Sequence, residues 1–208
     1  NSGLACKPYV GAIIVYNGDF TEMTGTVSLL ERPQTSPAPI PAVQVVGLNI
    51  GVEADAKGLY DLLGIPPGRY LLRFGAQGYF DEQRSVAVAG VGQAEAGPRV
   101  ALTRVAVSNL TQSCKIFTPD GDGIHDYAAC ELSLTRPCAF EAIILDAERE
   151  VVAPLLPRTV VAPGAMAFAW NGETETGDAA PSGWYSIQLT AYNGDDPIPQ
   201  AELRILLD

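Results

Sequence analysis

The sequence predicts an all-β protein made of two β-sandwiches in tandem, with one additional strand at the N-terminus. Short stretches that alternate apolar with polar or small residues recur along the whole chain, as expected for half-buried strands. Their spacing of roughly eight to twelve residues is typical of sandwiches. The 21 glycines and 16 prolines among 208 residues supply the turns and leave little room for long helices.

The predicted strands follow one another from end to end. In the first half they are residues 9–16, 24–31, 42–49, 58–63, 69–75, 84–90 and 99–107. In the second half they are residues 112–117, 127–134, 140–146, 149–153, 165–170, 183–192 and 201–207. Gly, Pro, Asn or Asp residues bound each stretch and mark the turns between strands.

Charge divides the chain near residue 106. Residues 1–106 contain nine acidic and eight basic residues, whereas residues 107–208 contain 15 acidic and five basic residues. The stretch from Val100 to Thr111 contains no Gly or Pro, so we expect the two halves to be joined by a continuous strand rather than by a flexible linker. The predicted organisation is an N-terminal extension at 1–23, a first sandwich at 24–106 and a second sandwich at 107–208.

Composition narrows the class of protein. The net charge of −11 argues against binding to nucleic acid, because a duplex-binding module needs a cationic surface to displace counterions. The 47% of hydrophobic residues is enough for a sizeable core. The longest uncharged apolar runs fall well short of the ~20 residues that a spanning helix needs, so insertion into a membrane is not expected.

The first predicted sandwich carries a motif of aromatic and turn residues. It reads Gly58-Leu59-Tyr60, then Ile65-Pro66-Pro67-Gly68-Arg69-Tyr70, then Gln77-Gly78-Tyr79. The prolines preset φ for a turn, and Gly68 can take a positive φ. The motif resembles carboxypeptidase regulatory-like, or transthyretin-like, domains and the related collagen-adhesin B repeats over residues 24–106. The resemblance implies a seven-stranded sandwich that serves as a spacer or adhesive module without catalysis.

The second half opens with an acidic loop. Asp120, Asp122 and Asp126 stand at positions 1, 3 and 7 of this loop, and such closely spaced carboxylates repel one another unless a cation lies among them. The glycines between the aspartates let the backbone wrap around an ion. A main-chain carbonyl can then point inward as a further ligand, and the carbonyl of Ile124 is the candidate. These hard oxygen ligands in a flexible loop suit calcium. The alternative is a solvated acidic turn without a metal.

Four motifs resemble the FlgD-like immunoglobulin-like domain of bacterial surface proteins. They are Phe117 to Asp126, Ile144 to Val152, Trp170 to Glu173, and Pro181 to Tyr185. The resemblance covers about residues 110–193 and implies an immunoglobulin-like (Ig-like) sandwich. It implies nothing specific about function, because one fold serves many functions.

The four cysteines allow three disulfide pairings and contain no C-x-x-C pair. If strands 112–117 and 127–134 pair in antiparallel fashion around the acidic loop, Cys114 faces Cys130, and a disulfide there would fix the base of the loop. Cys6 and Cys138 would then remain, and they could form a bond within one chain or between two chains.

An extra apolar strand, Tyr9 to Tyr16, precedes the first resemblance. Left unpaired, it would be an edge prone to association. Either it caps its own sheet, or it inserts into a neighbouring chain by strand addition. In the second case the subunit contacts are Tyr9, Val10, Ile13, Ile14, Val15 and Tyr16.

Export is the predicted fate of the chain. Its first residues lack the apolar region of a signal peptide, and an even number of cysteines in an acidic, turn-rich chain fits an oxidising compartment. We therefore predict an extracellular or cell-surface protein whose signal peptide has been cleaved. The plausible processed start and the ending on a strand favour a self-contained subunit.

No enzyme motif is present, and no catalytic residue is predicted, since the chain has a single His and no nucleophile elbow, zinc motif or phosphate loop. Exposed aromatics could bind carbohydrate, but Trp170, Trp184 and Tyr185 look like core and turn residues. Two hypotheses remain. The chain is a self-associating subunit of a surface filament, held through strand addition or head-to-tail contacts that involve Arg69, Arg73 and Arg84, or it is a spacer or adhesive module of a larger protein.

Overall fold

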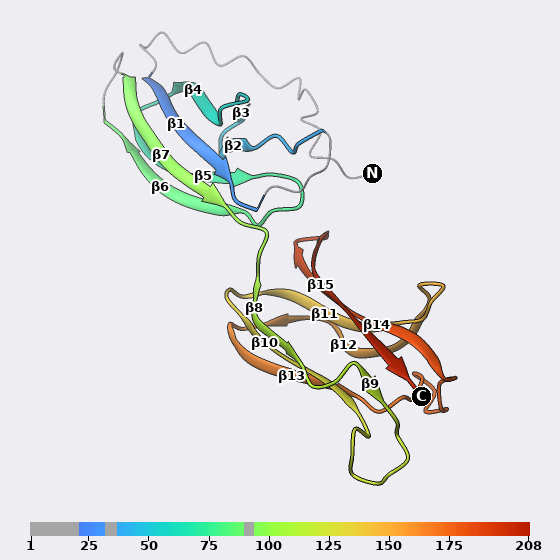
Figure 1. Cartoon of the computed structure of the whole chain (residues 1–208). Coiled ribbons are helices and arrows are strands. Elements are labelled where there is room, and N and C mark those ends of the chain that lie inside the picture. The colour runs from blue at the N-terminus through green and yellow to red at the C-terminus, as the bar shows by residue number, and fades with distance from the viewer. Residues whose placement is uncertain (1–20, 32–36, 90–93) are drawn as a thin grey trace.

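The computed structural model describes residues 21–31, 37–89 and 94–208. In this part of the chain all regular elements are strands, which confirms the all-β prediction. They form two modules, each with its own core, arranged one above the other along an elongated molecule (Figure 1). We call residues 21–102 the first module, residues 107–208 the second module and residues 103–106 the joint.

The first module is a sandwich of two sheets. One sheet has the order β4-β1-β7 and the other the order β3-β2-β5-β6. The strands are β1 (Thr21–Leu29), β2 (Ala42–Val45), β3 (Ile50–Glu53), β4 (Leu59–Ile65), β5 (Gly68–Gly75), β6 (Glu82–Val88) and β7 (Ala94–Leu102). Strands β1 and β7 run parallel, while the other pairs in this module are antiparallel.

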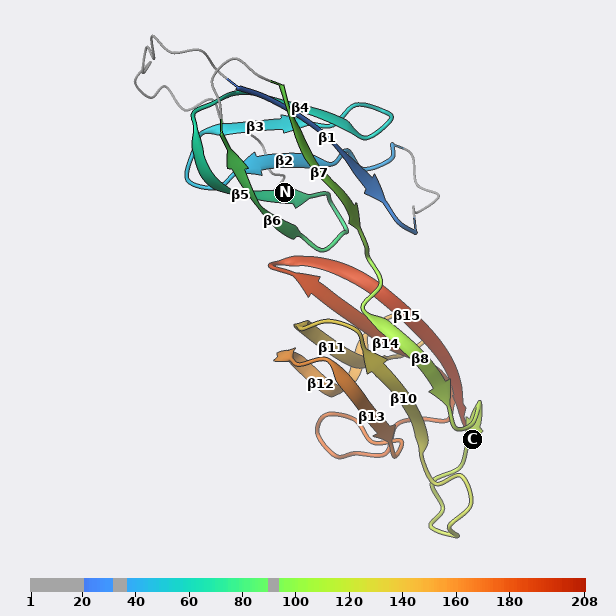
Figure 2. The ribbon, with the colours of Figure 1, turned by 90° about the vertical axis from the view of Figure 1, so that its left-hand side faces the viewer.

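The second module is also a sandwich. A sheet of order β13-β10-β8 faces a sheet of order β12-β11-β14-β15-β9 (Figure 2). The strands are β8 (Val107–Gln112), β9 (Ile116–Phe117), β10 (Ala128–Leu134), β11 (Cys138–Leu145), β12 (Val151–Val161), β13 (Gly164–Trp170), β14 (Gly183–Asn193) and β15 (Asp196–Leu207). β9 pairs in parallel with the end of β15.

Alternation of apolar and polar residues produces the two cores. In β1 every second side chain from Thr21 to Leu29 is buried, and β10 shows the same period from Ala128 to Leu134. Tyr60 illustrates the packing of the first core: its ring meets Phe74 of the opposite sheet at 5.6 Å between centroids, and its hydroxyl donates to the Pro98 carbonyl at 2.9 Å. Burial raises the pKa of Tyr60 to about 12.

Glycine makes room for this tyrosine. A Cβ built on Gly97 would lie 2.5 Å from the Tyr60 hydroxyl oxygen, and one on Gly25 would clash with the same ring. The aromatic residue of the Gly58-Leu59-Tyr60 motif therefore depends on two glycines from β1 and β7. No larger residue fits at either position without moving the ring.

The structure corrects several predicted elements. The Pro-Pro-Gly turn lies between β4 and β5 as predicted, and it connects strands of two different sheets, because β4 pairs with β1 whereas β5 pairs with β2 and β6. Strand β3 was not predicted, and β12 runs to Val161, well beyond residue 153. The predicted continuous strand across the joint is wrong, since β7 ends at Leu102 and β8 starts at Val107.

Among the described residues, no helix has the length and apolar character needed to cross a membrane.

Candidate metal centre and the joint between modules

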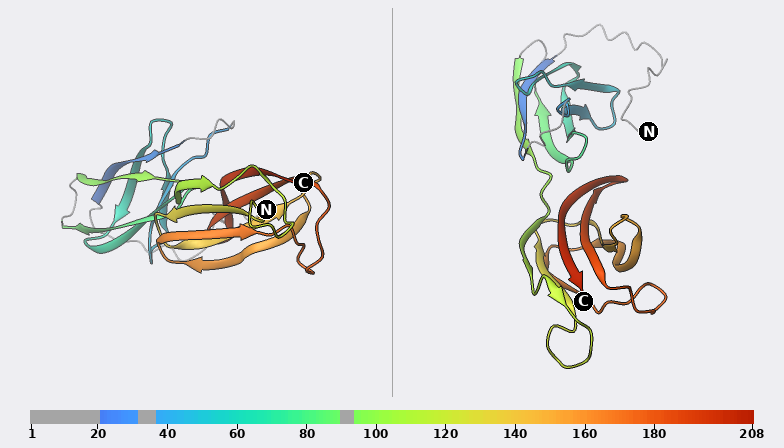
Figure 3. Two further views of the ribbon diagram at one scale, coloured as in Figure 1. Left: turned by 60° about the horizontal axis from the view of Figure 1, so that its bottom comes forward. Right: turned by 45° about the vertical axis from the view of Figure 1, so that its right-hand side comes forward.

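The acidic loop connects β9 to β10 at the end of the second module that lies farthest from the first (Figures 1 and 3). Three residues in it have a positive φ: Gly121 at 81°, Gly123 at 86° and His125 at 57°. Glycine is suited to the first two positions because L-residues rarely adopt such angles. The Thr118 N–H donates to the His125 carbonyl at 3.0 Å and closes the loop.

Main-chain N–H groups hold the carboxylates. The Asp120 Oδ1 accepts from the Asp122 N–H at 3.1 Å, and the Asp122 Oδ1 accepts from the Ile124 N–H at 2.7 Å. Asp126 uses both oxygens, accepting from Gly121 at 2.8 Å and from Gly123 at 2.9 Å. The loop thus folds around Asp126 because alternate peptide groups point inward at its carboxylate.

The three predicted aspartates do come together. One oxygen from each of Asp120, Asp122 and Asp126 lies within 4.8 Å of the other two. Their hydrogen bonds leave lone pairs free on every carboxylate, because each oxygen can accept more than one bond. Ile124, predicted to offer its carbonyl, lies in the same loop and is 66% exposed. Such a donor set, all oxygen, fits a hard cation.

A hollow of about 610 Å³ adjoins the loop. Its lining includes Cys114, Lys115, Asp120, Asp122 and His125, so it combines the metal candidates with the segment before β9. Lys115 brings one positive charge to this acidic end of the molecule.

The predicted disulfide at the base of this loop is not formed in the structure. Cys130 lies opposite Gln112, two residues before Cys114, because the pairing of β8 with β10 has a different register from the one expected. No described residue forms a disulfide with Cys114, Cys130 or the buried Cys138. Burial raises the pKa of both Cys130 and Cys138. Cys6 lies outside the described residues, so its pairing with Cys138 stays a prediction.

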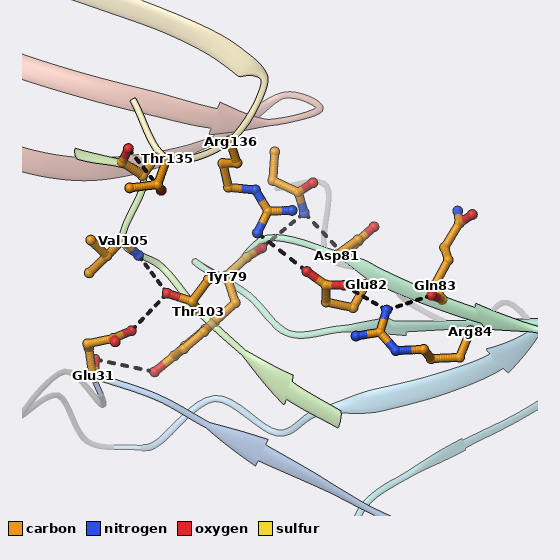
Figure 4. Close-up of polar contacts among 12 residues, drawn as sticks. Glu31, Tyr79, Asp81, Glu82, Gln83, Arg84, Thr103, Val105, Thr135 and Arg136 are labelled. Atoms are coloured by element: carbon orange, nitrogen blue, oxygen red, sulfur yellow. Dashed lines mark hydrogen bonds and ion pairs between the residues drawn. The ribbon is translucent and has the colours of Figure 1, made fainter. Parts of the chain in front are cut away.

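A cluster of apolar, cationic and polar contacts connects the modules, and Figure 4 shows its polar part. Tyr79 is buried in the core of the first module, whereas the next residue, Phe80, is 3% exposed and belongs to the core of the second module. The Arg136 guanidinium lies 4.3 Å from the centre of the Phe80 ring and also pairs with Glu82 of the first module at 3.5 Å. Adjacent residues of one turn therefore anchor two different cores.

Hydrogen bonds extend the same contact. The Asn193 amide of the second module donates to the Tyr79 carbonyl at 3.0 Å and to the Asp81 carboxylate at 3.2 Å. The Phe80 N–H donates to the Thr103 carbonyl at 3.0 Å. The main chain of the turn and the side chains around it are thus fixed from both sides.

Gln200 of β15 fixes the joint itself. Its Oε1 accepts from the N–H groups of Ala106 and Val107 at 2.7 and 3.3 Å, and its Nε2 donates to the Arg104 carbonyl at 2.9 Å. The Ala106 carbonyl in turn accepts from the Thr135 N–H at 2.8 Å. The four joint residues form no strand, yet the peptide groups of Arg104 and Ala106 have partners in the second module and the Thr103 carbonyl has one in the first.

The sequence analysis did not identify Phe80, Arg136, Asn193 or Gln200. One signal was available for Phe80, because two adjacent aromatic residues at 79 and 80 cannot both point into one core when the chain is extended. Asn193 and Gln200 lie near the turn between two strands, where polar residues are common, so their pattern offered no warning.

The structure places the predicted arginine and aromatic contact residues, except for those in the N-terminal segment. Arg73 pairs with Asp81, and Arg84 pairs with Glu82 at 3.0 Å, so both arginines have partners within the first module. Trp170 and Tyr185 belong to the second core, while Trp184 is 49% exposed and lies beside Arg204. The predicted contact segment Tyr9 to Tyr16 lies outside the described residues.

Comparison with known families agrees with the architecture of the second module. Residues 121–195 match the model of the FlgD Ig-like domain. This match falls inside the second module and confirms the resemblance proposed for it. The resemblance of the first module to carboxypeptidase regulatory-like domains stays a prediction. No curated protein matches the chain.

Several solved structures are similar to the chain. A cohesin–X-dockerin complex from Acetivibrio cellulolyticus matches with 17% identity over 38% of this chain and 56% of that chain, at a TM-score of 0.32. A putative carbohydrate binding protein from Bacteroides uniformis matches with 10% identity over 90% and 99%, at 0.39. The major pilin subunit of Bacillus cereus matches with 9% identity over 90% and 69%, at 0.36. With TM-scores below 0.5, these likenesses identify no ligand, partner or activity.

Proposed function

We propose that the chain is a rigid, non-enzymatic structural protein of the bacterial cell surface, whose copies associate through the segment from Tyr9 to Tyr16. The observation that carries the proposal is the joint. Two modules joined by a flexible linker would each have a separate core and separate hydrogen bonds. Here Phe80 of one module completes the core of the other. A rigid two-module body suits a protein that bears load or sets a distance.

The titratable groups favour a structural role over catalysis. Desolvation by burial is the main cause of each raised pKa among the described residues, namely those of Tyr60, Cys130, Cys138, Tyr185 and Tyr192. An active site would gather such shifts in one cleft around specific partners. One of these five residues lies in the first module, and the other four lie on three strands of the second, β10, β11 and β14. Glu202, whose pKa is lowered, owes its shift mainly to a hydrogen bond from Arg149 at the surface.

Surface location rests on the family match and the charge. The FlgD Ig-like match covers the second module, and the sequence resemblance connects that domain with bacterial surface proteins. The 15 acidic residues of the second half keep a repeated, closely packed structure soluble. Export with a cleaved signal peptide is part of the proposal.

Calcium is the proposed ion of the acidic loop. Asp120, Asp122 and Asp126 would provide carboxylate oxygens, with the Ile124 carbonyl as a further ligand. Bound there, the ion would offset the repulsion among three carboxylates whose oxygens lie within 4.8 Å of one another. The expected effect is a stiffer far end of the second module, since the loop has no strand pairing of its own between β9 and β10.

Self-association is tested by removing the segment that is proposed to cause it. The full chain and a chain lacking residues 9–16 are compared by size-exclusion chromatography with light scattering and by negative-stain electron microscopy, with and without calcium. Oligomers or filaments that require residues 9–16 support the proposal. A full chain that stays monomeric at high concentration, with its N-terminus verified by mass spectrometry, overturns it.

The alternative is a spacer or adhesive module of a larger protein. The same joint favours this second candidate, because a fixed angle between modules also sets the distance between flanking domains. A rigid monomer in solution, shown by a single narrow distribution of shapes in small-angle X-ray scattering, would support the spacer. Association dependent on residues 9–16 would support the subunit.

A further inference from the structure

The free edge of β13 differs from every other edge of the four described sheets. Edge strands in native proteins are guarded by charge, proline, bulges or shortness, because an unguarded edge pairs with other chains. β13, Gly164–Trp170, contains no charged residue and no proline. It pairs with β10 over seven consecutive residues without a register shift. The side of β13 that faces away from β10 therefore offers main-chain N–H and C=O groups in a regular row, to which another strand could pair.

Each of the other described edge strands has at least one feature that hinders pairing with another chain: a charged residue, a proline, a register shift or a short length. β12 contains Pro154, Pro157 and Arg158 and has shifted registers, and β7 contains Pro98 and Arg99 and a shift. β6 carries the charged residues Glu82 and Arg84. β4 contains Asp61 and has a register shift in its pairing with β1. β3 and β9 are short, with four and two residues. β8 has a shift and a positive φ of 53° at Asn109, and the Gln112 side chain bridges from it to β15.

The face of β13 that points away from the core is smooth. Ala165, Ala167 and Ala169 are exposed there, while Phe168 and Trp170 point into the core. Methyl side chains leave room for the larger side chains of an adjacent strand. An incoming strand would find donors and acceptors along its whole length and no side chain blocking it.

Resting on the self-association proposed above, we infer that the free edge of β13 accepts the segment from Tyr9 to Tyr16 of a second copy as an additional strand. The two sequences match in character. The segment Tyr-Val-Gly-Ala-Ile-Ile-Val-Tyr is uncharged and rich in β-branched and aromatic residues, and it is about as long as β13.

Chain length requires that the donor is a second copy. β1 runs from Thr21 at the far end of the first module to Leu29 near the joint (Figure 1), a distance of about 26 Å. Tyr16 is only five residues before Thr21, which allows at most ~18 Å of extended chain. β13 lies wholly beyond the joint, since even its nearer end, Gly164, pairs with Leu134. Tyr16 cannot lie beside β13 of its own chain.

Disulfide trapping tests the contact directly. One set of chains carries Ala167→Cys, and a second set carries a single cysteine at one of the positions 10–15, all in a background with Cys6→Ser and Cys114→Ser. The two sets are mixed and oxidised. Side chains on one face of neighbouring strands lie close enough for a disulfide, so we expect cross-linked dimers at alternate positions only. Cross-linking at no position, or equally at all six, overturns the inference.

Two controls complete this test. Val160→Cys, at a residue of the guarded strand β12 that is 80% exposed, replaces Ala167→Cys and should give no cross-link. A chain that carries both Ala12→Cys and Ala167→Cys should form no bond within one chain when oxidised at high dilution. An intramolecular bond there would overturn the assignment to a second copy.

A charge on the edge supplies an independent readout. Ala167→Lys should raise the apparent dissociation constant of self-association roughly tenfold or more, because a lysine guards the edge. Val160→Lys should leave it unchanged. If chains lacking residues 9–16 are monomeric but Ala167→Lys associates like the wild type, the acceptor edge is wrong and the proposed function stands. If chains lacking residues 9–16 still associate, the proposed function itself fails.

Discussion

The joint and the acidic loop are both short stretches without regular structure, yet they are held in opposite ways. The joint takes its partners from elsewhere in the chain: Gln200 binds its peptide groups, and Phe80 fills the second core beside it. The acidic loop is held by its own peptide groups, which donate to its own carboxylates. The first arrangement relies on a neutral amide and an aromatic ring, whereas the second brings three carboxylates together, whose repulsion the proposed calcium ion would offset.

The largest effect should come from breaking the joint. Phe80→Ala would leave a cavity in the second core and remove the ring beside Arg136, so we expect the free energy of unfolding to fall by about 3–5 kcal/mol. Chemical denaturation followed by tryptophan fluorescence measures it. Small-angle X-ray scattering should show a wider range of shapes at the same time. Leu63→Ala, at a residue 63% exposed, is the control and should change neither.

Calcium should stabilise the acidic loop without depending on the joint. At a concentration one hundred times the dissociation constant, binding should stabilise the chain by about 2.7 kcal/mol, seen as a rise in melting temperature that a chelator reverses. Asp122→Asn should abolish most of this rise, whereas Glu148→Gln, at an exposed acidic residue outside the loop, should preserve it. The Phe80→Ala variant should keep the response. A rise that survives Asp122→Asn would contradict calcium binding in the loop.

Gln200→Ala tests whether hydrogen bonds alone stiffen the joint. The variant would leave the Ala106 N–H and the Arg104 carbonyl without this partner, at a cost of about 1–3 kcal/mol. We expect a smaller widening of the scattering profile than for Phe80→Ala. Gln83→Ala, an exposed residue on β6, is the matched control. An unchanged profile and unchanged stability would show that Phe80 fixes the joint without help.

The smallest effect should come from an ion pair outside both regions. The Arg149 side chain donates to Glu202 at 3.1 Å and holds the pKa of that carboxyl below its usual value. Because a lowered pKa stabilises the fold above the unfolded value near 4.3 and is lost as the pH falls through the folded value, Arg149→Ala should cost under about 1 kcal/mol at pH 7. The difference from wild type should shrink below about pH 4, as followed by thermal denaturation. A cost that grows in acid would contradict this assignment.

Local patterns predicted most of the fold. Alternation located the core strands, and the spacing of the acidic residues located the three aspartates of the loop, because neighbouring residues carry both signals. What could not be predicted depends on tertiary pairing. The register of β8 against β10 differs by two residues from the expected one, so Gln112 and not Cys114 lies opposite Cys130. The Pro-Pro-Gly segment gave a turn but not which sheets it joins. The contacts of Asn193 and Gln200 become visible only when both modules are folded.

Strand β15 connects the two regions compared above. Gln200 lies near its start and binds the joint, while Leu206 and Leu207 at its end pair with Ile116 and Phe117, immediately before the acidic loop. A force that pulls the first module away from the far end of the second would be carried by the covalent chain through β8 and β9. β15 lies alongside this path, hydrogen-bonded to the joint near one end and paired with β9 at the other. A pull along β15 would load its pairs with β14 and β9 in shear, so these pairs would break together rather than one after another.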